Sequence, residues 1–430
     1  MKERNGQLRY LSIVIGAFLT VGVIVGLTNN LYSLYVIPIT TGLGISRGLY
    51  SMGITVRYIA SAFCNLFMGR LYQRFGYRRP TVLLVLLVAA SYVGYGTARN
   101  AVPLFLGALI YGVGEYFIST AALSRMLGNW FQSHLGVVTG IVMAASGVGG
   151  SALSLVLSGI MESAGWRASL LFAAGLLAAV AVMIFFVMKD RPEELALQPY
   201  HDPERRGAAH KPKKVAAPWA GVPMQVLLKK PYFYLTMIGM MLATIASNGV
   251  YSAVVPHLQD RGLSAAYAAK MLSLMLVLLA VDKIVLGMLA DRFGAHFSTL
   301  LCVLFTFSGI VVLTLVKNEW QAVIAVVLLS VSVCLNGFIQ PLLAAEIFGR
   351  SAYNTTLGIM MAMLSVGGLL SSPLVNFSFD ATGSYTRILI VLAVIAAVDA
   401  LFLLPAFHAE AKYRRELEVS GQLGDAGPET

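Results

Sequence analysis

Residues 69–76 read G-R-L-Y-Q-R-F-G, and residues 287–294 read G-M-L-A-D-R-F-G. Each of these stretches follows a long apolar segment and precedes another, and the two lie about half of the 430-residue chain apart. Such similarity at this spacing indicates that the chain consists of two copies of one membrane unit. Positions where the two copies differ are therefore the first places to look for function.

The composition is that of a membrane protein. Hydrophobic residues make up 58% of the chain and charged residues only 12%, whereas a soluble protein carries about 25% charged residues. Apolar runs of roughly 20 residues recur, and each can cross a hydrocarbon core as a helix. Helix is the expected form because lipid offers the backbone no hydrogen-bond partner. The runs also lack the strict alternation of a barrel strand.

The apolar runs predict an all-α protein with twelve transmembrane helices in two parallel six-helix repeats. The predicted spans are residues 11–38, 47–69, 80–98, 102–126, 135–160, 167–188, 232–256, 265–290, 297–316, 320–345, 353–376 and 385–407. The first run is too long for a signal peptide and lacks a convincing small-residue cleavage site.

The spans divide the chain into four parts. These are an N-terminal half at 1–188, a linker loop at 189–230, a C-terminal half at 231–407 and a tail at 408–430. The linker is the only long polar segment, and we expect it to be flexible or partly helical because it has little apolar surface to bury. The short polar tail is expected to be disordered.

The net charge of +11 does not indicate a nucleic-acid partner, because the basic residues follow the membrane topology. Most of them lie on the side that holds the N-terminus and the linker. The opposite side holds Arg47, Arg99, Arg167, Arg261, Lys270, Lys317 and Arg387. This positive-inside bias predicts a multi-pass protein of the cell membrane with both termini in the cytoplasm.

The repeat extends beyond the two loops. Residues 29–38 read N-N-L-Y-S-L-Y-V-I-P in the first span, and residues 248–256 read N-G-V-Y-S-A-V-V-P in the seventh. The glycine-rich stretch 140–150 of the fifth span likewise matches 358–368 of the eleventh. Six spans followed by six in the same orientation indicate parallel repeats about an axis along the membrane normal.

These features resemble the major facilitator superfamily. Its hallmark is a Gly-x-Leu-x-Asp-Arg-x-Gly-type loop after the second span, matched here at 69–76 and 287–294. Gln73 replaces the usual Asp in the first copy, whereas Asp291 keeps it in the second. The family uses that Asp in a charge relay that latches the cytoplasmic side. The resemblance thus implies gating roles for Gln73, Arg74, Asp291 and Arg292, with a weaker latch in the first half.

Within that superfamily the chain resembles the monocarboxylate transporters and the related oxalate–formate antiporters. The stretches that carry this resemblance are Asn129-Trp130-Phe131 with the glycine-rich span to Gly150, and residues 345–385. The charged first-span motif typical of animal monocarboxylate transporters is not found.

Lys283 is the strongest candidate for substrate binding. It lies four residues before Gly287, where the related transporters carry a basic residue, usually Arg, that binds the substrate carboxylate. Its counterpart in the first copy is Asn65, so the fold does not require a charge at this position. The alternative is a lysine that extends toward the cytoplasmic headgroups. In either case a charge inside a span is costly and is a functional candidate by default.

Two acidic residues are candidates for proton coupling. Glu115 lies near the middle of the fourth span, where a carboxyl group removed from water suits a proton carrier. A permanent pair with Arg57 or Lys283 is the alternative. Asp282 precedes Lys283, and adjacent helical side chains point about 100° apart. It is either a displaced proton site or a structural partner of a neighbouring helix.

Arg57 and three uncharged residues complete the predicted site. Arg57 either attracts anions or neutralises a carboxylate. Tyr32 and Tyr251 occupy matched positions of the two copies, and Asn336 is the counterpart of Glu115. We expect these side chains to shape the substrate pocket.

The function predicted on this basis is secondary active transport of small organic anions, in the form of proton-coupled monocarboxylate symport by alternating access. An organic anion exchanger of the oxalate–formate type is the alternative. Its second basic residue lies on the eleventh span, where this chain has apolar and small residues around Ser365. A metabolite sensor is a third hypothesis, but the linker leaves little room for a signalling domain.

No enzymatic motif is found. The sequence has neither a P-loop Gly-Lys-Ser/Thr nor a His-Glu-x-x-His pattern, so neither direct ATP hydrolysis nor zinc-protease chemistry is expected. We expect no cofactor and no metal. The expected partners are a small carboxylate, protons and the lipid bilayer, and the protein is expected to be monomeric.

Overall fold

The computed structural model describes residues 2–118, 120–133, 135–195, 197–200, 221–336 and 338–419. The N-terminal half contains α1 (Lys2–Thr20), η1 (Val21–Val25), α2 (Gly26–Asn30), α3 (Tyr32–Leu43), α4 (Arg47–Phe75), α5 (Arg78–Gly96), α6 (Val102–Ile118), α7 (Thr120–Trp130), α8 (Leu135–Val187) and η2 (Pro192–Leu195). The C-terminal half contains α9 (Met224–Leu227), α10 (Pro231–Asp260), α11 (Ala265–Phe293), α12 (Ala295–Thr314), α13 (Glu319–Ser330), η4 (Val331–Leu335), α14 (Ile339–Thr382) and α15 (Thr386–Val419).

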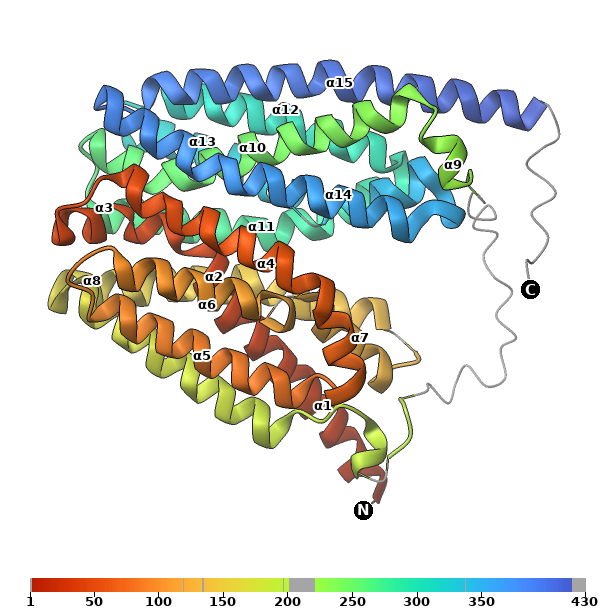
Figure 1. The fold of residues 1–430 in the computed structure, drawn as a ribbon, viewed down its shortest axis with the longest axis horizontal. Coiled ribbons are helices and arrows are strands. Elements are labelled where there is room, and N and C mark those ends of the chain that lie inside the picture. The colour runs from red at the N-terminus through yellow and green to blue at the C-terminus, as the bar shows by residue number, and fades with distance from the viewer. Residues whose placement is uncertain are drawn as a thin grey trace.

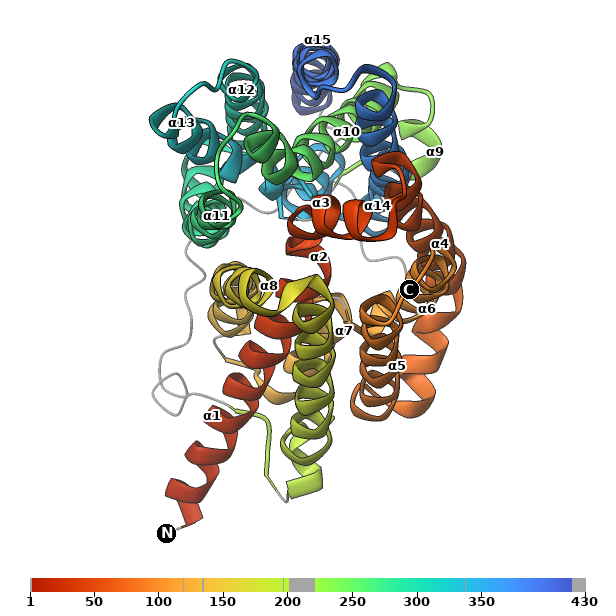
Figure 2. The ribbon, with the colours of Figure 1, turned by 90° about the vertical axis from the view of Figure 1, so that its left-hand side faces the viewer.

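The helices form two bundles that lie side by side, one from each half of the sequence (Figure 1 and Figure 2). The halves meet where α4 packs against α14 and where α8 packs against α11. The predicted all-α membrane fold is confirmed. By length and composition, eight of the described helices can each cross a membrane, or nine if one bent pair is a single span. The count of twelve spans stays a prediction.

Two long elements are each a pair of helices joined at a glycine. The 53 residues of α8 are interrupted at Gly165, whose φ of 83° is not helical. The same happens in α14 at Gly349, with φ of 68°. A positive φ is easily reached only by glycine. Each break falls between two predicted spans, so α8 covers the predicted spans 135–160 and 167–188.

Two helices of the described part are broken near the centre of the molecule. The first predicted span becomes α1, a wider turn in η1, then α2 and α3, with the break at Leu31. In the other half, α13 with η4 and the first part of α14 meet at an angle of 50°. Broken helices expose backbone groups and side chains toward the centre, which is typical of transporter binding sites.

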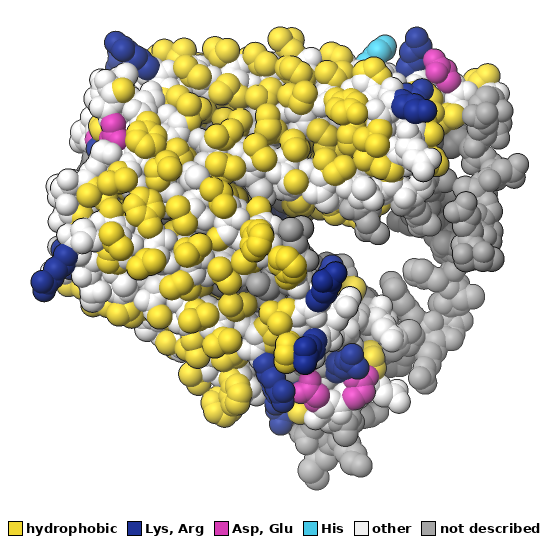
Figure 3. Space-filling model, viewed as in Figure 1, with side chains coloured by type: hydrophobic (Ala, Val, Ile, Leu, Met, Phe, Trp, Pro, Cys, Tyr) yellow, Lys and Arg dark blue, Asp and Glu magenta, His cyan; other side chains and the backbone are white. Residues whose placement is uncertain are grey.

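The two ends of the molecule differ. We call the end where α1 begins and α15 ends the linker end, and the opposite end, where α3 and α10 end, the Arg47 end. Figure 3 shows a hydrophobic middle with charged side chains gathered toward both ends, as expected for a protein embedded in lipid. The visible face is hollowed between the two halves on the side of the linker end.

The two repeated loops, 69–76 and 287–294, lie at the linker end. Gly76 ends α4 with φ of 74° and ψ of −162°, a conformation essentially confined to glycine. The Asp190 carboxylate accepts hydrogen bonds from the backbone N–H groups of Tyr77 and Arg78 at 2.9 and 2.8 Å. This carboxylate therefore binds the N-terminus of α5, where an anion is favoured by the helix dipole.

The second copy of the loop uses a different carboxylate. Gly294 has φ of 88°, and Glu346 accepts a hydrogen bond from the backbone N–H of Ala295. The Nδ1 atom of His296 lies 2.9 Å from Glu346. Both repeated loops thus end in a glycine followed by a carboxylate-bound helix start.

Replacing Gly76 with Ala is expected to destabilise the protein. A Cβ at this position would lie 2.2 Å from the Asp190 carboxylate, and the backbone conformation is strained for any other residue. We expect a loss of about 1–3 kcal/mol, measured as a lower midpoint of thermal unfolding in detergent. Gly44→Ala is the control, because Gly44 also has a positive φ but no atom lies within 4 Å of its Cβ position. Equal losses for the two variants would contradict the role of Asp190.

Candidate functional site

A cavity of about 380 Å³ lies between the two halves. From the N-terminal half it is lined by residues of α2, α3, α4 and α8. From the C-terminal half it is lined by residues of α10, α11 and α14 and by the break after η4. The predicted substrate residues Arg57, Lys283, Tyr32, Tyr251 and Asn336 all line this cavity. We call it the central cavity.

Lys283 crosses the interface between the halves. It lies on α11, and its Nζ atom donates to the Ser146 hydroxyl of α8 at 3.2 Å, with the Met143 carbonyl oxygen at 3.5 Å. Ser146 belongs to the glycine-rich stretch of the fifth predicted span. The ammonium group therefore faces the other half of the molecule rather than the headgroups at the end of its own helix.

Arg57 is held within the N-terminal half. One of its Nη atoms donates to the Asn29 side-chain oxygen, and its guanidinium lies 4.2 Å from the centre of the Tyr111 ring. The Tyr111 hydroxyl in turn donates to the Thr28 hydroxyl at 2.9 Å and to Asn29 at 3.1 Å. These contacts orient the guanidinium at the wall of the central cavity.

Tyr251 and the break in the first span form a second contact between the halves. The Tyr251 hydroxyl donates to the backbone carbonyl of Asn30 at 2.6 Å. That carbonyl is the last of α2, because Leu31 departs from helical geometry, so it lacks a helical partner. The Asn30 amide also donates to the Ser146 carbonyl at 2.9 Å. Tyr251, Asn30 and Ser146 thereby join α10, α2 and α8.

The side-chain oxygen of Asn336 has no hydrogen-bond partner among the described residues. Its amide nitrogen donates to the Ser247 hydroxyl at 2.9 Å and to the Asn248 oxygen at 2.8 Å. The Asn336 oxygen is buried. A buried acceptor of this kind favours a ligand that brings a hydroxyl or N–H group.

Of the two predicted proton carriers, Asp282 is the one whose side chain can be placed relative to this cavity. Asp282 does not line it, and instead lies beside Ser330 with Cys302 and Cys334 nearby, inside the C-terminal half. This separation from Lys283 follows from the turn of about 100° between adjacent helical residues. The backbone of Glu115 belongs to α6, but its side chain lies outside the described part of the structure.

The predicted gating residues lie at the linker end. Gln73 and Arg74 are exposed at the end of α4, and Asp291 and Arg292 are exposed at the end of α11. Both arginines extend beside the next residue, with guanidinium-to-ring distances of 5.3 Å to Phe75 and 5.2 Å to Phe293. The gating roles stay predictions.

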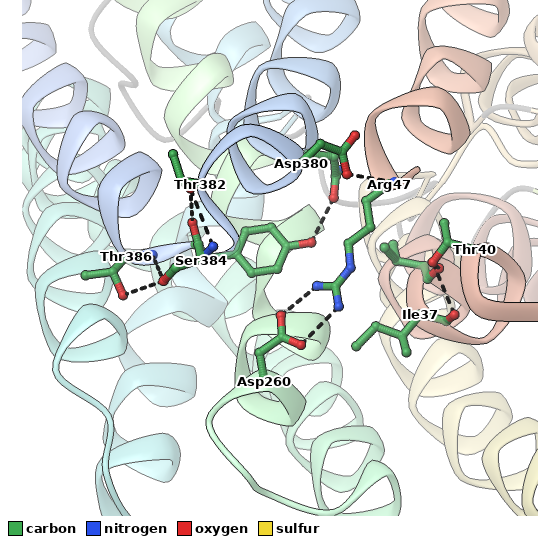
Figure 4. A network of polar contacts seen from close by, with 11 residues as sticks. Ile37, Thr40, Arg47, Asp260, Asp380, Thr382, Ser384 and Thr386 are labelled. Atoms are coloured by element: carbon green, nitrogen blue, oxygen red, sulfur yellow. Dashed lines mark hydrogen bonds and ion pairs between the residues drawn. The ribbon is translucent and has the colours of Figure 1, made fainter. Parts of the chain in front are cut away.

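A second set of inter-half contacts, at the Arg47 end, was not predicted (Figure 4). The Arg47 guanidinium donates to both carboxylate oxygens of Asp260, at 2.6 and 3.0 Å. The Asp380 carboxylate accepts from the backbone N–H groups of Arg47 and Gly48, at 3.0 and 2.7 Å. The guanidinium also lies 3.8 Å from the centre of the Phe379 ring. We call this cluster the Arg47 gate.

The Arg47 gate joins the first turn of α4 to the ends of α10 and α14, and so ties the halves together at this end of the molecule. The only signal in the sequence was that Arg47, Asp260 and Asp380 fall near span ends on the same predicted side of the membrane. Opposite charges on one side do not identify which pairs meet, because the residues lie far apart in the chain. The packing of the two halves makes that choice.

Comparisons with known proteins agree on the class of molecule. The chain is 25% identical to monocarboxylate transporter 12 of Rattus norvegicus over 78% of this chain and 71% of the relative. For the human form of that protein, the match spans 60% of its length. The chain is 24% identical to the uncharacterized MFS-type transporter YcxA of Bacillus subtilis over 88% of this chain and 91% of the relative.

Solved structures show the same fold. One is a bacterial homologue of the human lysosomal transporter Spinster, solved in an inward-facing and unoccupied conformation. It matches with a TM-score of 0.70 at 15% identity, covering 94% of this chain and 98% of that chain. Because the model of the Major Facilitator Superfamily matches residues 17–345, the chain belongs to this superfamily and is a transporter rather than an enzyme.

Proposed function

We propose that the protein is a secondary active transporter of small organic anions, and specifically of monocarboxylates. The observation that carries the proposal is the charge of the central cavity. Among its described lining residues, Arg57 and Lys283 are the charged ones, and both are cations. An anionic group is the partner that cations within a membrane protein favour, so two cations at one cavity support an anionic substrate.

The contacts of Lys283 suggest how binding is linked to movement. Its ammonium reaches across the interface to Ser146, so a carboxylate bound to Lys283 competes with a contact that joins α11 to α8. A ligand shifts an equilibrium between two states only if it binds them differently. Competition at this contact supplies such a difference, because it exists only while the halves are close.

The names of the relatives support a carboxylate. Monocarboxylate transporter 12 and monocarboxylate transporter 13 of Rattus norvegicus are each 25% identical to this chain over most of its length. A single carboxylate also suits the lysine, whose ammonium is a compact point charge rather than a two-pronged guanidinium.

Proton coupling is the finer part of the proposal. It rests on Glu115 and Asp282, two carboxyl groups within predicted spans, because intramembrane acids are typical of proton-coupled transporters. Asp282 fits the role in one respect: one of its carboxylate oxygens is buried without a hydrogen-bond partner among the described residues. We propose symport of one carboxylate with a proton through alternate opening of the two ends.

The orientation follows from the charge bias of the loops. With the linker end in the cytoplasm, the closed Arg47 gate faces outward and the hollow between the halves faces inward. The described state is then inward-open, and the Arg47 gate must separate for the outward-open state.

An organic anion exchanger is the second candidate. It is favoured by one observation, namely that two cations line one cavity, which suits a dianion as well as a monocarboxylate. Exchange and symport differ in their requirement for a counter-substrate, so the transport assays below separate them.

Lys283→Ala is expected to reduce monocarboxylate uptake. Loss of a charge-assisted contact costs about 1.5–3 kcal/mol, which lowers kcat/KM by about 10- to 150-fold. The measurement is uptake of labelled lactate and pyruvate into proteoliposomes. Lys283→Arg should keep part of the activity, and Lys270→Ala, which removes an exposed lysine from the same helix, should leave uptake unchanged. Normal uptake by Lys283→Ala would show that Lys283 does not bind the substrate.

An inward proton gradient is expected to drive accumulation of substrate against its own gradient by the wild-type protein. A protonophore should abolish this accumulation. Glu115→Gln and Asp282→Asn identify the proton carrier. The variant that lacks it should lose gradient dependence but keep counterflow of preloaded substrate, because binding and rocking remain. If wild-type uptake is independent of the proton gradient and requires internal substrate, the protein is an exchanger instead.

Arg47→Ala is expected to increase the fraction of molecules that are open at the Arg47 end, because it removes the paired contact to Asp260. The reporter is a single cysteine at Ser252, which lines the central cavity, in a background without Cys64, Cys302 and Cys334. A membrane-impermeant maleimide added outside intact cells should label this cysteine about 10-fold faster, equivalent to about 1.4 kcal/mol.

Lys317→Ala is the control for the Arg47 variant, since it removes a positive charge from the same end outside the Arg47 gate. Rapid labelling of the wild-type background would mean that the orientation is reversed. Unchanged labelling in Arg47→Ala would mean that the Arg47 gate does not hold this end closed.

A further inference from the structure

A second cavity, of about 90 Å³, lies inside the N-terminal half beside the central cavity. Among the described residues, Tyr32, Ile54 and Arg57 line both cavities, so these side chains stand between the two spaces. The remaining lining residues come from α2 to α6 and from α8, all within one half. Because Tyr35, Ile39 and Tyr50 line it, the second cavity extends from the central cavity toward the Arg47 end.

Tyrosine is the commonest residue type among its described lining residues. The lining includes Tyr32, Tyr35, Tyr50, Tyr92, Tyr95 and Tyr111. We call this space the tyrosine pocket. Among its described lining residues, Arg57 is the one charged group. A pocket of this composition favours apolar groups of a ligand, with the charged part held at its edge.

The hydroxyl groups of three of these tyrosines are used within the protein. Tyr35 pairs with the Ser169 hydroxyl at 2.8 Å, Tyr92 donates to the Leu27 carbonyl at 3.3 Å, and Tyr111 donates to Thr28 at 2.9 Å. Tyr32 is stacked on Tyr50 with ring centres 5.0 Å apart. The rings are thus held in place, and the hydroxyl groups of Tyr35, Tyr92 and Tyr111 are occupied within the protein.

The size of the tyrosine pocket limits what it can hold. A water molecule occupies about 30 Å³ of liquid, so the pocket of about 90 Å³ has room for a group roughly three times that size. The methyl group of pyruvate or lactate would leave most of it empty. A phenyl ring exceeds it, since an engineered cavity that binds benzene measures about 150 Å³. A branched alkyl group such as isopropyl matches the available space.

We propose that the tyrosine pocket receives the side group of the substrate, and that the preferred substrates are monocarboxylates with a short branched alkyl group. This inference rests on the proposed transport of monocarboxylates. The carboxylate lies in the central cavity beside Arg57 and Lys283, and the alkyl group extends past Tyr32 and Arg57 between the rings. The pocket therefore determines specificity, while the two cations supply the attraction common to all small carboxylates.

Gly53 offers a way to fill the tyrosine pocket without disturbing its walls. It lies on α4 and lines the pocket, and a Cβ added there would meet only the Cβ of Ala108, at 3.8 Å. Gly53→Leu therefore places a side chain where the ligand group is proposed to lie. Gly175→Leu is the matched control, because Gly175 is exposed on α8 in the same half with no atom within 4 Å of its Cβ position.

The test measures uptake of three 2-oxo acids by the full-length protein in proteoliposomes. Pyruvate carries a methyl group, 3-methyl-2-oxobutanoate an isopropyl group and phenylpyruvate a benzyl group, whereas the carboxylate and keto groups are the same. Each well-packed carbon is worth about 10-fold or more in kcat/KM. We expect wild-type protein and Gly175→Leu to prefer the isopropyl acid over pyruvate by at least that factor, and to take up phenylpyruvate poorly. Gly53→Leu should lose the preference, with a larger fall in uptake of the isopropyl acid than of pyruvate.

Two results overturn the inference alone. One is wild-type uptake of pyruvate with no preference for the isopropyl acid. The other is an equal fall for both acids in Gly53→Leu, which would make the pocket a space needed for the transport cycle rather than for the substrate. Failure of the wild-type protein to take up any of the three acids overturns the proposed function, and the inference with it.

Discussion

Hydrocarbon offers no hydrogen-bond partners and solvates no charge, and the whole arrangement of this chain follows from that constraint. Backbone groups are satisfied within helices. Where a helix is broken, as at Leu31, the freed carbonyl of Asn30 accepts the Tyr251 hydroxyl from the other half. Charged side chains lie toward the two ends of the molecule or inside it. The few that remain within spans are thereby concentrated at the interface between the halves or buried within one of them.

The same constraint explains how the halves are held together. Their contacts are a mixture of close helix packing and a small number of polar pairs. Ser151 pairs with Ser273 at 2.7 Å, and Ser154 donates to the Ala269 carbonyl at 3.0 Å, both between α8 and α11. Near the centre, Lys283 and Tyr251 add contacts, and the Arg47 gate joins the halves at one end. Each polar pair is modest in net energy because its partners can be satisfied by water when the halves separate. A set of such contacts suits a protein that must alternate between two states.

The two halves contribute different residues to the cavities. The N-terminal half contains Arg57 and the tyrosine pocket, whose tyrosines come from α3 to α6. The C-terminal half contributes Lys283 and Asn336, and it carries the acid Asp282 away from the cavity. A binding site built from two unlike halves can hold the charged end of a ligand from both sides while one side alone recognises the rest. This division agrees with the proposed roles of the two cations and of the tyrosine rings.

Much of this protein follows from the sequence alone. Hydrophobic run length and the repeated loop determine an all-helical membrane protein in two related halves, because the cost of polar groups in lipid acts locally on each segment. The rarity of charges in spans singled out Arg57 and Lys283, which line one cavity. Only the tertiary structure decided which residues meet. It separates Asp282 from Lys283, pairs Arg47 with Asp260, and encloses six tyrosines around one pocket. Those outcomes depend on how helices distant in the chain pack and rotate against one another, and hydrophobicity along one segment carries no information about that.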